Sequence, residues 1–411
     1  MDKERCNVRI GIVGLGYVGL VTAAVLASRG HSVTGVDVNM SRIQMIRSGK
    51  SPIFEPQLDE RIKSARNYLE FSSDYSKLST CEVIFLCVPT ANVGNKIDLK
   101  YVLSAASAVK KYNVYADLVI KSTVLPTTAR TVSELTGMNV VPNPEFTREG
   151  SAVHYTEKPD SIVIGGNSVE KVKNILKFTG SPMLITTNEN AELIKYASNA
   201  FLAVKISSIN QIADLCEKIP ETDVNMIAQG MGLDRRIGRE FLIAGLGYGG
   251  SCFPKDTVAI YSFAKETGSD LSIINSAIQY DENRVAMLVN RIEENFDRLE
   301  GKKVCLLGLR FKDNADDLRE SRSLVIIENL KKRGVIVRAY YPVVRNISSF
   351  ELADDLNDCI STSEIVITAT EWKEFSKIDP TLLKGKKVFD LRRVFGRNIV
   401  EITMGVGIGK N

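Results

Sequence analysis

The hydrophobic positions in the first part of the chain form short runs separated by amphipathic stretches. Apolar runs of strand length occur at residues 8–13, 31–36, 82–88 and 118–121. Helical periodicity lies between them, beginning at residues 20–28. Short apolar strands that alternate with helices are typical of a parallel sheet covered on both faces. The pattern therefore predicts an α/β domain at residues 1–187.

The same alternation returns at the end of the chain. Strand-like runs occur at residues 304–307, 335–339, 365–369 and 387–389. Between the two α/β regions, a helical pattern runs from residue 190 to about 217 without Pro or Gly, longer than the average globular helix. We therefore expect a helical middle at residues 188–298, containing a long helix for dimerisation, and a second α/β domain at 299–411.

Composition excludes several classes of protein. The 411 residues include 53 Lys and Arg against 49 Asp and Glu, too small a bias to suggest nucleic acid as a ligand. No stretch approaches the ~18 apolar residues of a membrane span, and the first residues do not resemble a signal peptide, so we expect a cytoplasmic protein. Seven cysteines without a CxxC pair favour reduced thiols over a disulfide frame or a metal site.

A glycine motif follows the first strand directly. Residues 14–19 read G-L-G-Y-V-G and open a helix, and Asp37 ends the next strand. Strand, G-x-G-x-x-G, helix, strand and acid form the dinucleotide fingerprint, in which the backbone approaches a pyrophosphate at a helix N-terminus. Asp37 is placed to accept both adenosine ribose hydroxyls and to repel a 2′-phosphate, which favours NAD over NADP. The cofactor-binding candidates in the motif are Gly14, Gly16, Tyr17, Val18 and Gly19.

Further candidates follow other strands. Pro89 and Thr90 come after strand 82–88, and Thr123 comes after strand 118–121. The carboxyl ends of parallel strands line the ligand crevice, so these residues are expected on the nicotinamide side. Arg42 lies either over the adenine or a phosphate, or in solvent at the surface.

A glycine-rich loop ends in a cysteine. Residues 245–256 read G-L-G-Y-G-G-S-C-F-P-K-D. Glycine lets the main chain close around a ligand, and Cys252 beside Lys255 and Asp256 suits a nucleophilic thiol with a carboxylate that handles a proton. A turn that ends in a small buried cysteine is the alternative.

We expect His31 to be structural.

Two further constellations each allow two interpretations. Lys195 and Asn199 lie at i and i+4 of the predicted long helix, so both side chains can point at one ligand; an exposed lysine beside a surface asparagine is the alternative. Glu145 and Glu149 flank Arg148. They form either a helix-surface salt bridge or a polar wall of an active site.

Taken together, these motifs resemble the UDP-glucose/GDP-mannose dehydrogenase family. The resemblance covers essentially the whole chain. It rests on G-L-G-Y-V-G (14–19), K-S-T-V (121–124), N-P-E-F-T-R-E-G (143–150), A-E-L-I-K-Y-A-S-N-A-F (191–201), G-Y-G-G-S-C-F-P-K-D (247–256) and F-K (311–312) with R-E-S (319–321). It implies two Rossmann-like doubly wound parallel-sheet domains, the first binding NAD and the second holding UDP, joined by a long central helix that forms a homodimer.

The implied activity is four-electron oxidation of the C6 alcohol of UDP-glucose to UDP-glucuronate, using two NAD. A cysteine thiolate adds to the intermediate aldehyde to give a thiohemiacetal. The thiohemiacetal gives up a second hydride to NAD and becomes a thioester, which water hydrolyses. The first-step base is either a water held by Thr123 and Asp256 or neutral Lys195. The runner-up substrates are GDP-mannose and UDP-N-acetylmannosamine. Two functions of a different kind also stay open: a β-hydroxyacid dehydrogenase that performs one oxidation, and a non-catalytic nucleotide-sugar sensor.

The resemblance also implies residue roles. The implied catalytic residues are Cys252 as nucleophile, with Lys195, Asn199, Asp256, Glu145 and Thr123 around the reacting carbon. The implied further cofactor contacts are Glu149, Lys255 and Arg319. The implied substrate contacts are Glu145, Phe146, Thr147, Arg148, Glu149, Lys195, Asn199, Phe241, Leu242, Ile243, Ala244, Gly245, Gly249, Phe311, Lys312 and Arg392. Arg236 matches an arginine that reaches the sugar in the neighbouring subunit. Ile243 departs from a lysine found in some relatives.

Overall fold

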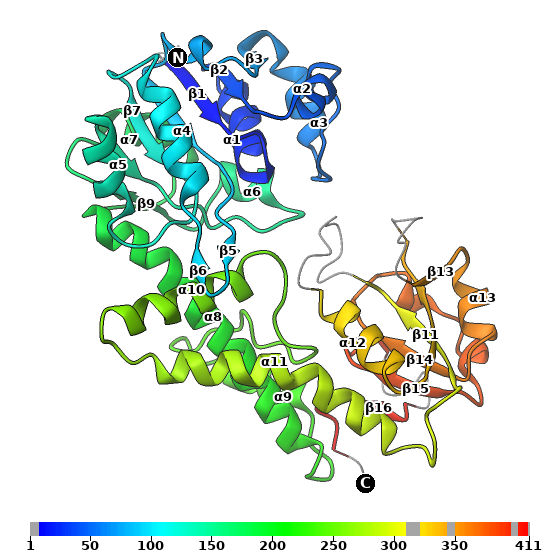
Figure 1. The fold of residues 1–411 in the computed structure, drawn as a ribbon. Coiled ribbons are helices and arrows are strands. Elements are labelled where there is room, and N and C mark those ends of the chain that lie inside the picture. Colours follow the sequence, from blue (N-terminus) through cyan, green and yellow to red (C-terminus); the bar gives the residue numbers. More distant parts are fainter. Residues whose placement is uncertain (1–7, 310–320, 343–349, 396–401, 410–411) are drawn as a thin grey trace. The chain divides into compact units, whose positions relative to one another are not determined.

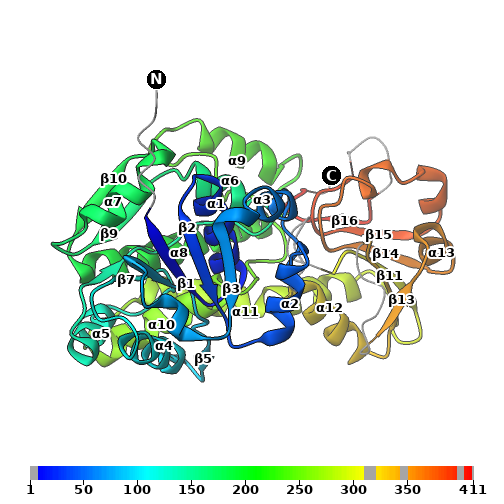
Figure 2. The same ribbon diagram turned by 90° about the horizontal axis from the view of Figure 1, so that it is seen from above.

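The computed structural model describes residues 8–309, 321–342, 350–395 and 402–409, and the chain divides into two compact units, Met1–Ser198 and Asn199–Asn411 (Figure 1). The first unit contains a six-stranded parallel sheet in the order β3-β2-β1-β4-β7-β8. Strands β1, β2, β3 and β7 of this sheet are labelled in Figure 2. Its strands are β1 (Arg9–Val13), β2 (Ser32–Val36), β3 (Leu69–Ser72), β4 (Val83–Leu86), β7 (Asp117–Ile120) and β8 (Val140–Pro142). This is the Rossmann strand order, and it confirms the α/β class that the sequence pattern predicted.

Helices cover both faces of this sheet because successive strand residues point to opposite sides. In β4, Val83 and Phe85 join the apolar cluster that contains α1 (Tyr17–Ser28). Ile84 and Leu86 join the cluster of α4 (Lys100–Lys110) and α5 (Thr128–Thr136). The other helices of the unit are α2 (Met40–Arg47), α3 (Leu58–Ser64), α6 (Ala152–Glu157) and α7 (Glu170–Leu176).

Two short strand pairs stand apart from the main sheet. Strand β9 (Ile162–Gly165) pairs in parallel with β10 (Met183–Thr186). An antiparallel pair, β5 (Asn92–Val93) and β6 (Lys96–Ile97), was not predicted.

The second unit begins with helices. The predicted long helix is α8 (Asn188–Cys216), which starts in the first unit and ends in the second. It is followed by α9 (Val224–Gly232), α10 (Phe253–Glu266) and α11 (Ser272–Glu293).

A second parallel sheet follows, with the order β13-β12-β11-β14-β15-β16. Its elements are β11 (Lys303–Leu307), α12 (Arg322–Lys331), β12 (Ile336–Tyr340), β13 (Glu351–Ala353), α13 (Leu356–Ser361), β14 (Ile365–Thr368), β15 (Lys387–Asp390) and β16 (Met404–Gly405). Val304 and Leu306 of β11 pack in the cluster that includes α11 and α12, whereas Leu307 faces the cluster of α13. The helical middle and the second sheet therefore share one core.

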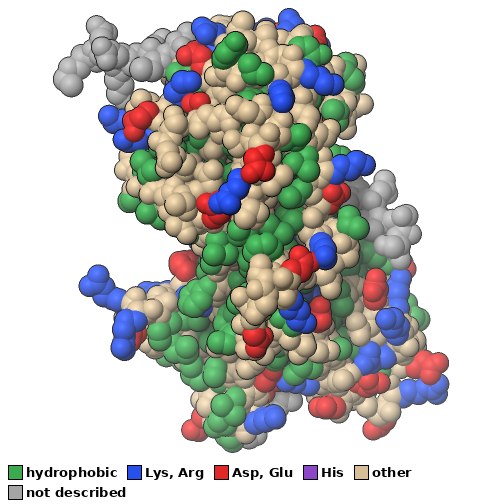
Figure 3. Space-filling view, turned by 60° about the vertical axis from the view of Figure 1, so that its left-hand side comes forward, with side chains coloured by type: hydrophobic (Ala, Val, Ile, Leu, Met, Phe, Trp, Pro, Cys, Tyr) green, Lys and Arg blue, Asp and Glu red, His purple; other side chains and the backbone are tan. Residues whose placement is uncertain are grey.

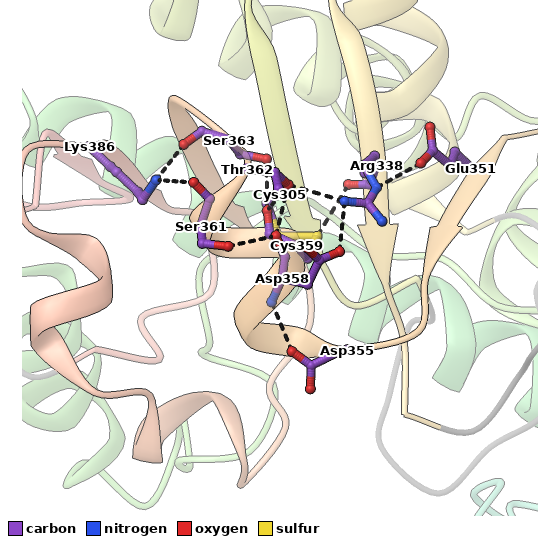
Figure 4. Close-up of a disulfide and its surroundings, with 10 residues drawn as sticks. All are labelled: Cys305, Arg338, Glu351, Asp355, Asp358, Cys359, Ser361, Thr362, Ser363 and Lys386. Atoms are coloured by element: carbon purple, nitrogen blue, oxygen red, sulfur yellow. Dashed lines mark hydrogen bonds and ion pairs between the residues drawn. A yellow bond between two sulfur atoms is a disulfide. The ribbon is translucent and has the colours of Figure 1, made fainter.

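The expectation of reduced thiols is wrong for two cysteines. Cys305 of β11 and Cys359 of α13 form a disulfide, with a Cα–Cα distance of 5.6 Å (Figure 4). Both side chains are fully buried in the second unit. The sequence did not show this pair because 54 residues separate the two cysteines, and only the packing of α13 on the sheet brings them together.

Within the described residues, no helix combines the length and apolar character needed to cross a membrane.

Candidate active site

The glycine motif forms a tight turn between β1 and α1. Gly14 has φ +91°, and a Cβ there would lie 2.7 Å from the carbonyl oxygen of Cys87. A Cβ at Gly19 would collide with the backbone oxygen of Gly14, so both positions require glycine. A Cβ at Gly16 would meet no atom within 4 Å. The turn therefore leaves open space before the N-terminus of α1, where the backbone can receive a pyrophosphate.

Asp37 is fixed at the end of β2. One carboxylate oxygen accepts hydrogen bonds from Leu15 N over 2.7 Å and Arg42 Nη1 over 2.9 Å, and the other accepts from Asn39 N over 2.8 Å. The Asp37 side chain is buried. These contacts hold the acid beside the glycine turn, as an NAD site requires, and they show Arg42 paired with Asp37 rather than free in solvent.

Glu55 was missed from the sequence. Tyr17 donates a hydrogen bond from its hydroxyl to Glu55, and Gly150 N donates to the Tyr17 hydroxyl over 2.7 Å and to Glu55 Oε2 over 2.9 Å. Burial, together with the Glu55 carboxylate, raises the pKa of Tyr17 far above its ordinary value. Glu55 thus ties the glycine turn to the loop that ends at Gly150. It lies in an irregular segment with no motif, so no signal marked it.

The N-P-E-F-T-R-E-G stretch is a loop, not a helix. Glu145 Oε1 lies 3.7 Å from Lys195 Nζ, and Glu145 Oε2 accepts from the backbone and hydroxyl of Thr147. Burial alone would raise the pKa of Glu145, but the Lys195 ammonium and the Thr147 hydrogen bonds outweigh it and hold this pKa below its ordinary value. The helix-surface alternative is therefore wrong for Glu145, and Lys195, at 5% exposure, is not a surface lysine.

The other residues of this loop also face neighbouring groups. Lys195 Nζ lies 5.1 Å from the centroid of the Phe146 ring. The Arg148 guanidinium carbon lies 5.0 Å from the centroid of the Tyr155 ring. Glu149 lies in the turn before Gly150.

The loops after β4 and β7 are joined. Ser122 donates a hydrogen bond from Oγ to Val88 O over 2.7 Å, next to Pro89 and the buried Thr90. Thr123 follows Ser122 and is half-buried. The predicted nicotinamide-side residues therefore lie on two linked loops at the carboxyl end of the sheet.

The two histidines lie on other elements. His31 is buried, accepts a hydrogen bond from Val8 N over 3.4 Å, and has a pKa lowered by burial, which fits a structural role. His154 lies on α6.

In the second unit, Cys252 is exposed at the N-terminus of α10. The alternative of a buried cysteine is therefore wrong. Burial raises the pKa of Cys81 to about 11 and that of Cys87 to about 12. Cys216 is also buried, so Cys252 is the exposed thiol among the residues the structure describes.

Asp256 organises the polar groups after the cysteine. Its carboxylate is 1% exposed and accepts hydrogen bonds from Asn199 Nδ2 over 2.6 Å and from Lys255 Nζ. Asn199 is 5% exposed, so the surface-asparagine alternative is also wrong. The implied catalytic residues therefore form two local groups, Lys195 with Glu145 in the first unit and Asn199 with Asp256 in the second.

Several implied substrate residues line one pocket of the second unit. Leu242, Ile243 and Arg392 border a cavity of about 720 Å³ together with Trp372. Its other lining residues include the basic side chains of Arg239, Lys373 and Arg393. Ile243 is 59% exposed, so its apolar side chain borders a pocket that several basic residues and Glu371 also line.

The remaining implied substrate residues are spread over the second unit. Phe241 has φ +65°, and its ring lies 6.0 Å from that of Phe253. Gly245 lies under Arg392, because a Cβ there would come within 2.7 Å of Arg392 Nη1. Ala244 is buried, and Gly249 lies in the same loop. The Arg236 side chain is 89% exposed and pairs with Asp234. Phe311, Lys312 and Arg319 lie outside the described residues.

Comparisons with known proteins match most of the chain. Three models of the UDP-glucose/GDP-mannose dehydrogenase family match: the NAD binding domain at residues 8–178, the central domain at 189–283 and the UDP binding domain at 305–397. The UDP-glucose 6-dehydrogenase YwqF of Bacillus subtilis is 37% identical over 94% of this chain and 93% of its own length.

Solved structures agree with this match. A UDP-glucose dehydrogenase from the archaeon Pyrobaculum islandicum has a TM-score of 0.92 and 36% identity, and the alignment covers 99% of each chain. A UDP-D-ManNAc dehydrogenase from Pyrococcus horikoshii has a TM-score of 0.88 and 28% identity over 98% of this chain and 100% of its own.

Proposed function

This chain belongs to the UDP-glucose/GDP-mannose dehydrogenase family, and we propose that it oxidises the C6 alcohol of UDP-glucose to UDP-glucuronate. The observation that carries the proposal is the exposed Cys252 thiol at the start of α10, four residues before a buried carboxylate that Asn199 holds in place. A second support is the 37% identity to a curated UDP-glucose 6-dehydrogenase.

NAD would be held by the first unit, where the residues fit it. The glycine turn and the N-terminus of α1 would receive the pyrophosphate, and Asp37 would bind the adenosine ribose. Pro89, Thr90 and Thr123 would face the nicotinamide, and Glu149 and Lys255 would contact the cofactor. When bound, NAD supplies the oxidising power for both steps.

Cys252 would act after the first oxidation. The N-terminus of α10 favours the thiolate through its partial positive charge. The thiolate forms a bond to the aldehyde carbon, and the carbonyl electron pair moves to oxygen, where Lys195 and Asn199 donate hydrogen bonds. Such a donor often contributes about 3 kcal/mol. After the second oxidation, water attacks the thioester, the C–S bond breaks, and the thiolate is restored.

In the first oxidation, one of two bases would accept the proton of the C6 hydroxyl. One is a water held by Thr123 and Asp256, and the other is Lys195 in its neutral form. The Lys195–Glu145 pair supports a charged resting lysine, which favours the water.

An NADH assay tests the proposal. With UDP-glucose, we expect two NADH per UDP-glucuronate, checked by mass analysis of the product. Rates measured with GDP-mannose and UDP-N-acetylmannosamine test the alternative substrates. The 28% identity to the Pyrococcus enzyme is the reason to include the second of these sugars. One NADH per substrate indicates a single-oxidation enzyme, and none indicates a sensor; either result would overturn the proposal.

We also propose a cytoplasmic homodimer formed through α8, with three functional parts at residues 1–187, 188–298 and 299–411. Phe201 and Leu215 of α8 are 65% and 52% exposed, and apolar side chains gather over the helical part of the second unit (Figure 3). In a dimer, Arg236 would reach the sugar bound to the neighbouring subunit. Light scattering of Phe201→Asp tests the interface, with a monomer as the expected result.

A further inference from the structure

Side chains, rather than regular secondary structure, hold the backbone of loop 245–248, which leads to Cys252. Gly245 N donates a hydrogen bond to Asn210 Oδ1 over 2.8 Å, and Arg284 Nε donates to Gly245 O over 3.0 Å. Asn210 and Arg284 are both fully buried. The start of the loop is therefore fixed to α8 and α11.

The end of this loop is held by an ion pair. Tyr248 N donates to Asp281 Oδ1 over 2.6 Å, and Arg322 Nε donates to Tyr248 O over 2.8 Å. Asp281, on α11, and Arg322, the first residue of α12, also pair with each other. A Cβ at Gly247, which has φ +96°, would lie 2.1 Å from Asp281 Oδ1. The backbone therefore lies directly against the carboxylate.

Stability alone is a weak reason for this arrangement. Asp281 is 1% exposed, and a buried ion pair often contributes no more than apolar residues of similar volume. What the pair does supply is position, because its two members bind both the N–H and the C=O of Tyr248. Since Arg322 belongs to α12, the loop is also fixed relative to the second sheet.

On the basis of the function proposed above, we propose that Asp281 and Arg322 are a positioning pair for Cys252. They fix loop 245–248, which ends four residues before Cys252, without touching the reacting atoms themselves. A displacement of about 1 Å at a reacting atom reduces the rate on the order of 10²-fold. Loss of the pair should therefore lower kcat more than substrate affinity.

Arg322→Lys tests this idea, because a lysine lacks the planar fork that reaches both Tyr248 O and Asp281. We expect kcat to fall by about 10²-fold, with the KM for UDP-glucose changed by less than about threefold. The matched control is Arg333→Lys. Arg333 follows α12 and pairs with Glu293 of α11 over 2.8 Å, so it links the same two helices away from the loop, and its kcat should stay at the wild-type value.

A second measurement does not depend on the reaction. The rate at which iodoacetamide modifies Cys252, followed by peptide mass, should change in Arg322→Lys and in the isosteric Asp281→Asn, but not in Arg333→Lys. Circular dichroism identifies any variant that fails to fold. Wild-type kcat and wild-type alkylation in folded Arg322→Lys and Asp281→Asn would overturn the positioning role. Absence of NADH from every sugar would overturn the proposed function but leave the alkylation test valid.

Discussion

Asn199 of α8 donates a hydrogen bond from Nδ2 to Oδ2 of Asp256 on α10 over 2.6 Å, and both side chains are buried. A buried carboxylate needs such partners, because an unsatisfied charge in the interior is costly. The amide nitrogen carries two hydrogens, and Asp256 takes one of them. The second remains for the oxyanion that the proposed mechanism creates beside Cys252.

Asp256→Asn should therefore impair catalysis. The amide removes the charge that orients Asn199 and Lys255, and we expect kcat to fall on the order of 10²-fold, as when an oxyanion donor is lost. Steady-state NADH formation measures the effect. Asp270→Asn, an exposed neighbour in sequence, is the control and should behave as wild type. Wild-type turnover by Asp256→Asn would refute its role.

Asp37→Asn should weaken NAD binding. The Asp37 carboxylate accepts from two backbone N–H groups, one at each oxygen, and an amide can accept at only one of these positions. Since a hydrogen bond to a charged group contributes about 1.5–3 kcal/mol, we expect the KM for NAD to rise by about tenfold or more. The KM for UDP-glucose serves as the internal control. Equal loss of affinity for both substrates would argue against a cofactor-specific role.

The Lys195–Glu145 pair should make stability depend on acid. The folded pKa of Glu145 lies below its ordinary value of 4.5, so the pair's contribution is complete above pH 4.5 and is lost as the pH falls through the folded pKa. The difference in Tm between wild type and Glu145→Gln should therefore shrink below pH 4.5. Thermal unfolding across this range tests the sign, and a difference that grows in acid would contradict it.

Removal of the Cys305–Cys359 disulfide should destabilise the second unit. For two cysteines 54 residues apart, the chain-entropy model gives a contribution of roughly 4 kcal/mol. Urea unfolding of Cys305→Ala/Cys359→Ala should show this loss, and added reductant should lower the stability of wild type but not of the double variant. Equal sensitivity of both proteins to reductant would rule out the disulfide as the cause.

The fold followed from local patterns because each strand and helix carries its own periodicity. Both α/β domains and the long helix α8 were predicted in this way, whereas the Rossmann-like character of both domains was implied by the family resemblance. The short edge strands β3 and β13 were not predicted, because their sequences, L-E-F-S and E-L-A, mix charged with apolar residues and do not stand out from loops.

The site was only partly predictable, for a related reason. Cys252, Asp256 and Lys195 lie in motifs whose spacing is visible along the chain. Asp281 and Arg322 lie in no such motif. Asp281 contacts Tyr248, which is 33 positions away in the sequence, and Arg322, which is 41 positions away. The partner of a polar residue within a helix cannot be identified from the sequence when the contact forms only in the folded chain.

The central claim is that the thiol of Cys252 captures the half-oxidised sugar. The most direct measurement is the NADH yield per UDP-glucose in Cys252→Ser, with mass analysis of both sugar and protein. We predict that the variant stops at a covalent or aldehyde-level species and does not complete the second oxidation and hydrolysis. Two NADH per UDP-glucuronate at the wild-type rate from Cys252→Ser would contradict the mechanism.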